Sequence, residues 1–241
     1  MIRRKIVEGF EAGIVVPQGL LAHGRGEAID YILGETTHPP ALEATRAAAA
    51  LLLLSKHPVI SVNGNTSSLV PHEIIRLSKL LKARIEVNLF HRTPERVKRI
   101  KEFLEKMGAE DILGDSDLVE IPGLSSQRRF VAREGIYSAD TVLVPLEDGD
   151  RAEKLVAMKK KVVAIDLNPL SRTSKAATIS IVDNVVRAMP NLCRAVEELK
   201  VKPTSELERI YHLFNNEENL RRMIELIFRR LSRLAGLEEQ I

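Results

Sequence analysis

The sequence predicts an α/β fold, in which helices flank a mostly parallel β-sheet. Short runs of β-branched and apolar residues recur between residues 59 and 182, and longer segments with helical periodicity separate them. The chain has 241 residues and is 44% hydrophobic, which suffices for a continuous core. We therefore expect residues 1–241 to form a single α/β domain.

The expected elements follow one another in three blocks. Residues 1–56 and 184–241 are expected to be helical, and the sheet is expected within 57–183. The strands are expected at the five apolar runs 59–62, 84–89, 141–144, 161–165 and 178–182. Helices are expected between them at 71–82, 94–107 and 150–159, with a further helix at 125–134 that Gly135 would end.

The helical ends carry their own stop and start signals. Pro17 opens a helical stretch that Gly24–Arg25–Gly26 is expected to interrupt, and the pair Pro39–Pro40 begins a helix that continues to Leu54. Asp183 is expected to cap a helix that ends at Leu199, and one or two charged amphipathic helices follow at 205–237.

Composition favours a soluble, cytoplasmic protein. The one cysteine, Cys193, rules out an intramolecular disulfide and is expected to be a buried, inert thiol. The first residues lack an apolar run with a cleavage site, and the most apolar stretch, 47–54, is far shorter than the roughly 20 residues of a membrane span. The six histidines are scattered without metal-ligand spacing, so we do not expect a zinc site.

The charge is balanced, at a formal net of +3 from 36 basic and 33 acidic residues. Arginines cluster between 221 and 233, but they alternate with apolar residues and neighbour Glu217, Glu218 and Glu225. This pattern favours a solvated or dimer-facing helix. A non-enzymatic nucleic-acid-binding protein remains an alternative, and steep salt dependence of binding would support it.

Three expected strands run into polar loops, where open α/β sheets bind ligands. After the first strand come small and amide side chains that suit a phosphate at a helix N-terminus: Asn63, Gly64, Asn65, Thr66 and Ser67. In the alternative interpretation, Ser67 or Ser68 merely caps the helix. The loop is not a Walker A motif, because it lacks Gly-Lys-Ser/Thr at fixed spacing.

The second loop is acidic and the third is rich in hydroxyl and basic groups. Glu147, Asp148 and Asp150 can coordinate Mg²⁺ or orient an amine, although a solvated turn capped by Asp150 is the plainer interpretation. In the third loop, Asp166 can hydrogen-bond a ribose, and Ser171, Arg172 and Thr173 can meet phosphate oxygens. The alternative for this loop is again a capped turn.

Two basic segments lie outside these loops. Glycines flank Arg25 and allow the backbone to approach a ligand closely, unless they only break a helix. Gln127–Arg128–Arg129 offers a basic pair for a phosphate, and an exposed helix face is the commoner explanation for such a pair.

These segments together resemble the archaeal-type 4-phosphopantoate–β-alanine ligases, also called phosphopantothenate synthetases. The resemblance rests on AHGRGEAIDYILGE at 22–35, VNGNTSSL, PLEDGDRAEKL and DLNPLSRTSKAATISIVDNV at 166–185. The last motif is the most specific, and the likeness covers essentially the whole chain. A nucleotide-dependent oxidoreductase is the alternative on such a sheet, but it predicts a glycine fingerprint that Asn63–Gly64–Asn65–Thr66 does not supply.

The resemblance implies a homodimer with a Rossmann-like core at 57–183 and a dimer-forming helical tail. It implies that ATP and 4-phosphopantoate bind the core, and that β-alanine is the second acid joined. The residues expected to hold ATP by this likeness are Arg3, Arg25, Asp166, Leu167, Asn168, Arg172, Thr173, Asn184 and Val185. We assign the loop from Asn63 to Ser67, with Arg128 and Arg129, to 4-phosphopantoate as a hypothesis.

The family chemistry explains these residue types. It is expected to pass through an acyl-adenylate with release of pyrophosphate, after which the amine of β-alanine displaces AMP. The first step joins two anions, so Arg3, Arg25, Arg172 and Mg²⁺ are suited to offset the repulsion. Asp166 is expected to orient the nucleotide beside Arg25 and Arg172. The sequence does not identify the base for the amine, and it does not rank Glu147, Asp148, Asp150 and Asp183 as Mg²⁺ ligands.

Overall fold

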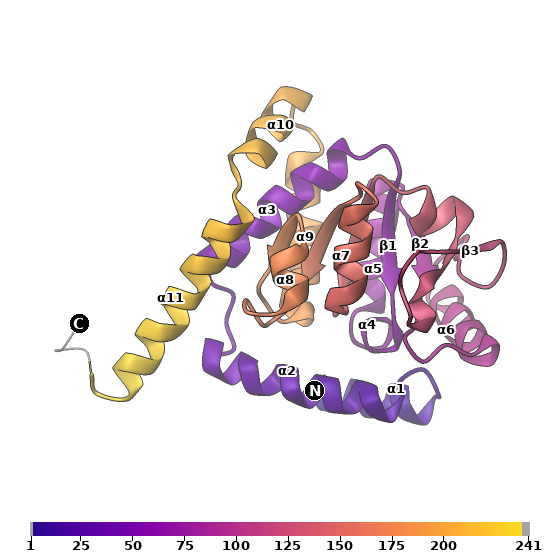
Figure 1. The fold of residues 1–241 in the computed structure, drawn as a ribbon, viewed down its shortest axis with the longest axis horizontal. Coiled ribbons are helices and arrows are strands. Elements are labelled where there is room, and N and C mark those ends of the chain that lie inside the picture. The colour runs from indigo at the N-terminus through magenta and orange to yellow at the C-terminus, as the bar shows by residue number, and fades with distance from the viewer. Residues whose placement is uncertain (1, 238–241) are drawn as a thin grey trace.

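The structure is a computed structural model that describes residues 2–237. Its centre is a five-stranded, fully parallel sheet in the order β2-β1-β5-β6-β7 (Figure 1). The strands are β1 (Pro58–Val62), β2 (Arg84–Val87), β5 (Thr141–Pro145), β6 (Lys161–Ile165) and β7 (Ile179–Ile181). The predicted α/β fold is therefore confirmed, with β2 ending two residues and β7 one residue before the predicted strand ends.

The strand order creates a topological switch point. From β1 the chain passes first to β2 on one side and later to β5 on the other side. In open parallel sheets, the carboxyl ends of two such strands leave a crevice in which ligands bind. The crevice here lies where β1 continues into Asn63 and β5 continues into Leu146.

Helices cover both faces of the sheet, as a sheet buried on both sides requires. On one face α3, α5 and α9 pack together, and on the other face lie α7 and α8 (Figure 1). Neighbouring strand residues alternate between the two cores: Ile60 joins the first, and Val59 the second. These helices are α3 (Pro39–Leu54), α5 (Pro71–Leu81), α6 (Pro94–Lys106), α7 (Gly149–Ala157), α8 (Arg172–Ala176) and α9 (Val185–Leu199).

Several local predictions about these helices are corrected. Asn184, not Asp183, caps α9, because the Asp183 carboxylate is engaged by Arg187 and Thr37. Asp148 occupies the N-cap position of α7, so Asp150 lies inside the helix.

Cys193 is buried on α9, and burial raises the pKa of its thiol to about 11, as expected of an inert cysteine.

The segment predicted as a helix at 125–134 is mostly not helical. It consists of a short 3₁₀ turn η1 (Gln127–Arg129) and the strand β4 (Phe130–Ala132), which pairs antiparallel with β3 (Leu118–Glu120). A one-turn η2 (Arg133–Tyr137) follows. The buried carboxylate of Glu86 accepts hydrogen bonds from the backbone N–H groups of Ala132 and Ile136, at 3.0 and 2.7 Å. A long-range polar contact of this kind overrides local helical periodicity and holds the segment extended.

The N-terminal helices cross the carboxyl ends of the strands. They are α1 (Ile2–Glu11) and α2 (Pro17–Leu33), and α4 (Gly64–Leu69) lies between them and the sheet (Figure 1). The prediction that Gly24–Arg25–Gly26 interrupts the helix is wrong, because α2 runs through it. A glycine costs a helix only about 1 kcal/mol relative to alanine, and contacts at both ends of α2 offset that cost.

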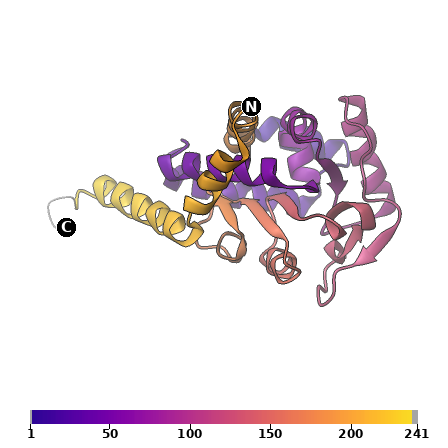
Figure 2. The ribbon, with the colours of Figure 1, turned by 90° about the horizontal axis from the view of Figure 1, so that it is seen from above.

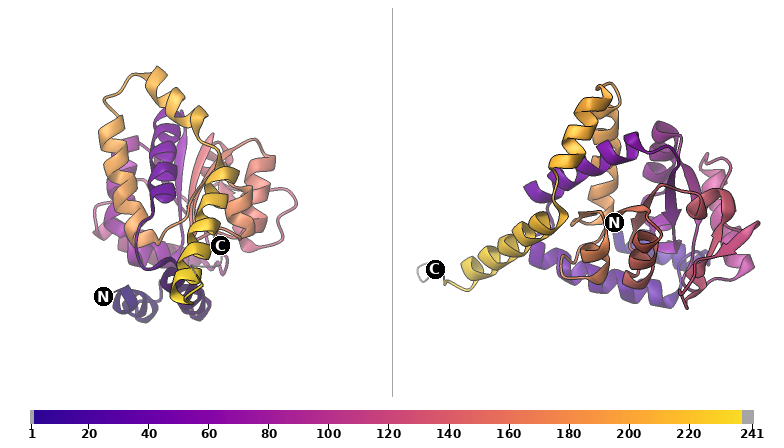
Figure 3. Two further views of the ribbon diagram at one scale, coloured as in Figure 1. Left: turned by 90° about the vertical axis from the view of Figure 1, so that its left-hand side faces the viewer. Right: turned by 45° about the horizontal axis from the view of Figure 1, so that its top comes forward.

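The chain ends in α10 (Thr204–Leu213) and α11 (Asn216–Leu234). α10 packs on α3, whereas α11 crosses α3 and α2 and then extends beyond the body of the molecule (Figure 2). Its far half stands clear of the body in the right-hand view of Figure 3. Within residues 2–237, no helix is both long enough and apolar enough to cross a membrane.

Candidate functional site

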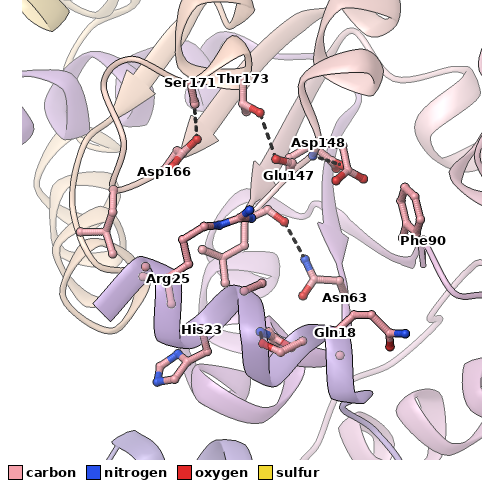
Figure 4. A pocket seen from close by; sticks show the side chains of 18 of the residues that line it. Gln18, His23, Arg25, Asn63, Phe90, Glu147, Asp148, Asp166, Ser171 and Thr173 are labelled. Atoms are coloured by element: carbon pink, nitrogen blue, oxygen red, sulfur yellow. Dashed lines mark hydrogen bonds between the residues drawn. The ribbon is translucent and has the colours of Figure 1, made fainter. Parts of the chain in front are cut away.

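A cavity of about 830 Å³ lies at the carboxyl edge of the sheet. α2 forms one wall, and the loops after all five parallel strands form the other (Figure 4). This is where the switch point predicts a ligand site. Its lining comprises Val16, Gln18, Gly19, Ala22, His23, Arg25, Gly26, Glu27, Ile29, Asn63, Gly64, Asn65, Leu69, Leu89, Phe90, His91, Arg96, Arg128, Leu146, Glu147, Asp148, Gly149, Asp150, Asp166, Leu167, Asn168, Ser171, Arg172, Thr173, Asn184 and Val185.

α2 is fastened at both ends of the cavity. Near its start, the side-chain N–H of Asn65 donates to the carbonyl of Gly19 at 2.8 Å. Near its end, the carboxylate of Asp30 accepts from Asn184 at 2.7 Å and from Arg187 at 2.6 Å. The middle of the helix then presents Arg25, whose side chain points into the cavity (Figure 4). These contacts hold the helix in place, so the backbone at Arg25 has a fixed position although glycines flank it.

The loop after β1 is organised by Asn63. Its carboxamide oxygen accepts from the N–H of Thr66 at 3.1 Å, and the Thr66 hydroxyl accepts from the N–H of Asn63 at 2.9 Å, which forms a capping box. The Asn63 amide N–H group also donates to the carbonyls of Pro145 and Leu146 (Figure 4). Asn63 therefore caps α4, in place of the predicted Ser67 or Ser68, and it bridges the two strands of the switch point.

The loop after β6 is built around Asp166. Its carboxylate accepts from the Ser171 hydroxyl at 2.5 Å and from the N–H of Asn168 at 2.9 Å. Burial raises the pKa of Asp166, and these hydrogen bonds with the charge of Arg25 act in the opposite direction. The Thr173 hydroxyl donates to the carbonyl of Glu147 at 2.9 Å, which ties this loop to the loop after β5. The two neighbouring loops thus form one connected surface.

A buried ion network supports the floor of the cavity. The Glu147 side chain, 1% exposed, contacts Arg128 at 2.6 Å and forms a second, very short ion pair with the fully buried Arg151. Arg151 also donates to the Ser61 hydroxyl on β1 at 3.2 Å. Such a network contributes little net stability because each ion is desolvated, but it fixes the geometry of its members. Arg128 is therefore held in one orientation at the cavity surface.

Asp148 stands at the edge of this network. One carboxylate oxygen, Oδ2, is buried 2.9 Å from Nε of Arg128, without the alignment of a hydrogen bond. Burial raises the pKa of Asp148, and the Arg128 charge opposes that shift. The side chain as a whole is 43% exposed and lines the cavity. Because Oδ2 is buried, that exposure belongs to the rest of the side chain, including Oδ1.

A second, half-buried guanidinium lies near Arg128. Arg96, on α6, donates to the carbonyl of Ile14 at 2.9 Å and to that of His91 at 2.8 Å. Burial and the charge of Arg128 lower the pKa of Arg96 to about 10, so it remains charged at neutral pH. Its Nη2 lies against Gly64, where a Cβ atom would approach it to 2.5 Å. Two guanidinium groups therefore lie beside the α4 loop at this end of the cavity.

The structure brings most of the predicted residues together. Of the predicted nucleotide residues, Arg25, Asp166, Leu167, Asn168, Arg172, Thr173, Asn184 and Val185 line the cavity. Of the predicted phosphopantoate residues, Asn63, Gly64, Asn65 and Arg128 line it. Their roles remain predictions, but their shared location is what both assignments require.

Four predicted residues do not line the cavity. Arg3 reaches Glu27 and Tyr31 on the exposed face of α2, so it meets the cavity only through Glu27. Thr66 and Ser67 are buried inside α4. Arg129 points away from its neighbour Arg128, donates to the carbonyl of Ser125 and stacks on Phe130.

Sequence reasoning missed Gln18, His23, Phe90, His91 and Arg96 on the lining. The last three follow β2, whose polar continuation His91–Arg92–Thr93 was a usable signal of a loop at the ligand edge. The first two lie on α2, where no local pattern distinguishes a residue that faces a cavity from one that faces solvent.

The carboxylates considered for Mg²⁺ are engaged elsewhere. Glu147 and Asp148 contact Arg128, Asp150 contacts Arg172 at 2.6 Å, and Asp183 contacts Arg187 at 2.7 Å. In residues 2–237 no group of three or more His, Cys, Asp or Glu side chains is placed to hold a metal ion.

Comparisons with known proteins identify the family of the chain. The family model described as phosphopantothenate/pantothenate synthetase matches residues 40–230. A 4-phosphopantoate–β-alanine ligase of Thermococcus kodakarensis is 52% identical over 234 residues, covering 97% of this chain and 90% of the relative. A protein of the same name from Methanosarcina mazei is 50% identical over 236 residues, covering 98% and 93%. The chain therefore belongs to the phosphopantothenate/pantothenate synthetase family.

Proposed function

We propose that this protein is a 4-phosphopantoate–β-alanine ligase, which makes phosphopantothenate for coenzyme A synthesis. The observation that carries the proposal is the match to ligases of this name at about half identity over nearly the whole chain. The oxidoreductase and nucleic-acid-binding alternatives have no comparable support. The roles of individual residues below extend the proposal to the cavity.

The nucleotide is proposed to bind at the β6–β7 end of the cavity. Asp166 and Asn168 are arranged to orient the ribose and base, since the Asp166 carboxylate is fixed by Ser171 and faces the Arg25 charge. Arg172 stands at the cavity rim on Asp150 and Glu153, at 2.6 and 2.8 Å. A triphosphate at this position would compete with those carboxylates for the guanidinium, because arginine also forms bidentate, charge-assisted hydrogen bonds with phosphate.

4-Phosphopantoate is proposed to place its phosphate between Arg96, Arg128 and the loop that begins at Asn63. Arg128 is buried and Arg96 is half-buried, and burial together with the Arg128 charge lowers the pKa of Arg96. An arriving dianion relieves that repulsion, so binding is favoured by more than simple pairing at the surface. The substrate carboxylate would then extend toward Arg25 and the nucleotide.

The proposed chemistry is activation of the carboxylate as an acyl-adenylate. A carboxylate oxygen attacks the α-phosphorus of ATP and pyrophosphate leaves, after which the amine of β-alanine attacks the acyl carbon and AMP leaves. Arg25 and Arg172 would offset the negative charge that develops on the α-phosphate. Catalysis would come from charge stabilisation and from holding two anions in contact inside one cavity.

Mg²⁺ is proposed to arrive with the nucleotide rather than to occupy a resident site. The cavity carboxylates contact arginines, and Mg²⁺ commonly binds through substrate phosphates while it keeps several waters. Its contribution would be to neutralise phosphate charge. Arg25, Arg128 and Arg172 remain the protein's own cations in this scheme.

A homodimer in the cytoplasm is also proposed. α11 projects from the body and exposes apolar side chains along one side, among them Phe228 at 56% and Leu234 at 68%. Exposed apolar residues aligned on a projecting helix are typical of a self-association surface. Near the base of the helix, Arg222 pairs with Glu43 of α3, which sets its direction.

Product analysis with single-substrate omissions tests the proposed function. Purified protein with ATP, Mg²⁺, 4-phosphopantoate and β-alanine should form AMP and phosphopantothenate together, and only when both acids are present. ADP in place of AMP would retain the ligase but replace the adenylate with an acyl-phosphate. No condensation product under any of these conditions would contradict the proposal.

A further inference from the structure

Asp148 lines the cavity and has a carboxylate oxygen, Oδ1, for which the structure describes no partner. Asp150 is the other such carboxylate, but its side chain is 63% exposed and pairs with the exposed Arg172. Five carboxylates line the cavity among residues 2–237: Glu27, Glu147, Asp148, Asp150 and Asp166. Glu27 accepts from Arg3, and Asp150 contacts Arg172 at the rim. Glu147 is enclosed by two arginines, and Asp166 accepts from Ser171 and Asn168. Asp148 contacts Arg128 through its buried Oδ2 alone.

The position of Asp148 is between the two proposed substrate subsites. Figure 4 shows it at the end of β5, with Phe90 on one side and the group formed by Asp166, Ser171 and Thr173 on the other. Its hydrogen-bonded neighbour Glu147 fixes its backbone, since the N–H of Asp148 donates to Glu147 Oε1 at 2.8 Å. The carboxylate is thus presented from the N-cap position of α7, next to the arginine proposed to hold 4-phosphopantoate.

The charges of the reactants identify the partner that fits this carboxylate. ATP and 4-phosphopantoate are anions, and an unshared carboxylate repels both of them. β-Alanine carries an ammonium group, which is the one cationic group among the three organic substrates. A carboxylate with one oxygen on Arg128 and the other facing the cavity can hold an ammonium beside the activated acyl group.

We propose that Asp148 binds the ammonium group of β-alanine and accepts the first proton that it loses. The inference rests on the proposed function and deepens it, because the sequence identified no base for the amine. The ammonium transfers one proton to Asp148 and becomes a neutral amine. Its nitrogen attacks the acyl carbon, a C–N bond forms, and the bond from that carbon to the AMP oxygen breaks. The second proton leaves the nitrogen to solvent, and Asp148 then releases its own proton.

The test compares three reactions of Asp148→Asn, a variant of nearly equal size. Exchange of pyrophosphate into ATP that depends on 4-phosphopantoate, without β-alanine, reports adenylation. Hydroxylamine, a nucleophile that is largely uncharged at neutral pH, traps the acyl-adenylate as a hydroxamate. Phosphopantothenate formation reports the whole reaction. We expect the first two rates to stay near those of the unaltered protein, while kcat/KM for β-alanine falls about 100-fold or more.

Two further variants make the result specific. Asp148→Glu retains the carboxylate and is expected to recover part of the β-alanine reaction. Asp117→Asn is the matched control, because Asp117 pairs with Arg133 at the β3–β4 hairpin and does not line the cavity. It should leave all three rates unchanged.

The outcomes separate this inference from the proposed function. If Asp148→Asn lowers pyrophosphate exchange and hydroxamate formation as much as amide formation, Asp148 only positions Arg128 and the inference fails. It also fails if the variant uses β-alanine normally. If the unaltered protein itself catalyses none of the three reactions, the proposed function is wrong, and the inference falls with it.

Discussion

At the scale of single residues, the cavity depends on charges that are buried before any ligand arrives. Arg151 is completely buried and meets Glu147, which in turn meets Arg128 at the surface. Desolvation makes such a chain a poor source of stability, so its value lies in holding Arg128 in one place. Arg96 is held in the same way by two backbone carbonyls. Both guanidiniums are therefore preorganised for an anion.

Arg96→Gln tests this anion site. Removing one charged donor to a phosphate costs about 1.5–3 kcal/mol, so the KM for 4-phosphopantoate is expected to rise about 10- to 100-fold, with the KM for ATP nearly unchanged. Steady-state kinetics with each substrate varied in turn measures both values. The matched control is Arg99→Gln on the same helix, because Arg99 lies against Gly13 and outside the cavity lining. Equal effects of the two variants would contradict the assignment.

The residues that line the cavity could be predicted from the sequence where they directly follow a strand, and could not be predicted elsewhere. Asp166 and Asn63 follow directly from apolar strands, and the structure places both on the cavity. Arg128 and Arg129 cannot be distinguished in the sequence. In the structure, the Asn88 side-chain amide donates to the carbonyls of Arg128 and Phe130 and fixes the turn in which only Arg128 reaches the cavity. That separation depends on contacts between distant parts of the chain, which local patterns do not contain.

At the scale of elements, glycines have different roles in α2 and α4. A Cβ atom on Gly24 would have no neighbour within 4 Å, whereas one on Gly64 would lie 2.3 Å from the carbonyl oxygen of Ile14. The Gly24–Arg25–Gly26 pattern suggested a helix break, yet α2 is continuous. The glycine that the site requires is Gly64, which lets the segment before α2 close over the loop after β1.

A pair of alanine substitutions tests that difference. Gly24→Ala should raise the free energy of unfolding by up to about 1 kcal/mol, because alanine favours the helix and meets no obstacle. Gly64→Ala should lower it by about 1–3 kcal/mol, because the backbone at Ile14 must move. Denaturant unfolding of both variants measures these changes. Similar changes in the two variants would show that the close approach at Gly64 is not a constraint.

At the scale of the whole molecule, the alternation of apolar runs and helical segments predicted the sheet and its flanking helices. The order β2-β1-β5-β6-β7 could not be predicted in this way, because it depends on which strands pair across the chain. The segment 125–134 was misassigned for a related reason, since the buried Glu86 fixes it from β2. Long-range partners decide the parts of the fold that periodicity leaves open.

The arrangement of the whole molecule suits one cavity to the two anions and the amine proposed to bind there. Five loops from one sheet edge and a helix fastened at both ends meet around about 830 Å³. Arg25, Arg96, Arg128 and Arg172 are distributed along the lining, and Asp148 stands among them. We propose that this cavity activates the carboxylate of 4-phosphopantoate by transfer to an adenylyl group.

An oxygen-isotope measurement distinguishes this route from activation as an acyl-phosphate. 4-Phosphopantoate labelled with ¹⁸O in its carboxylate is turned over with ATP and β-alanine, and the phosphorus-containing products are examined by mass spectrometry. The acyl-adenylate route transfers one labelled oxygen to AMP, because the C–O bond of the mixed anhydride breaks when the amine attacks. Label in inorganic phosphate together with ADP, or AMP that carries no label, would contradict it.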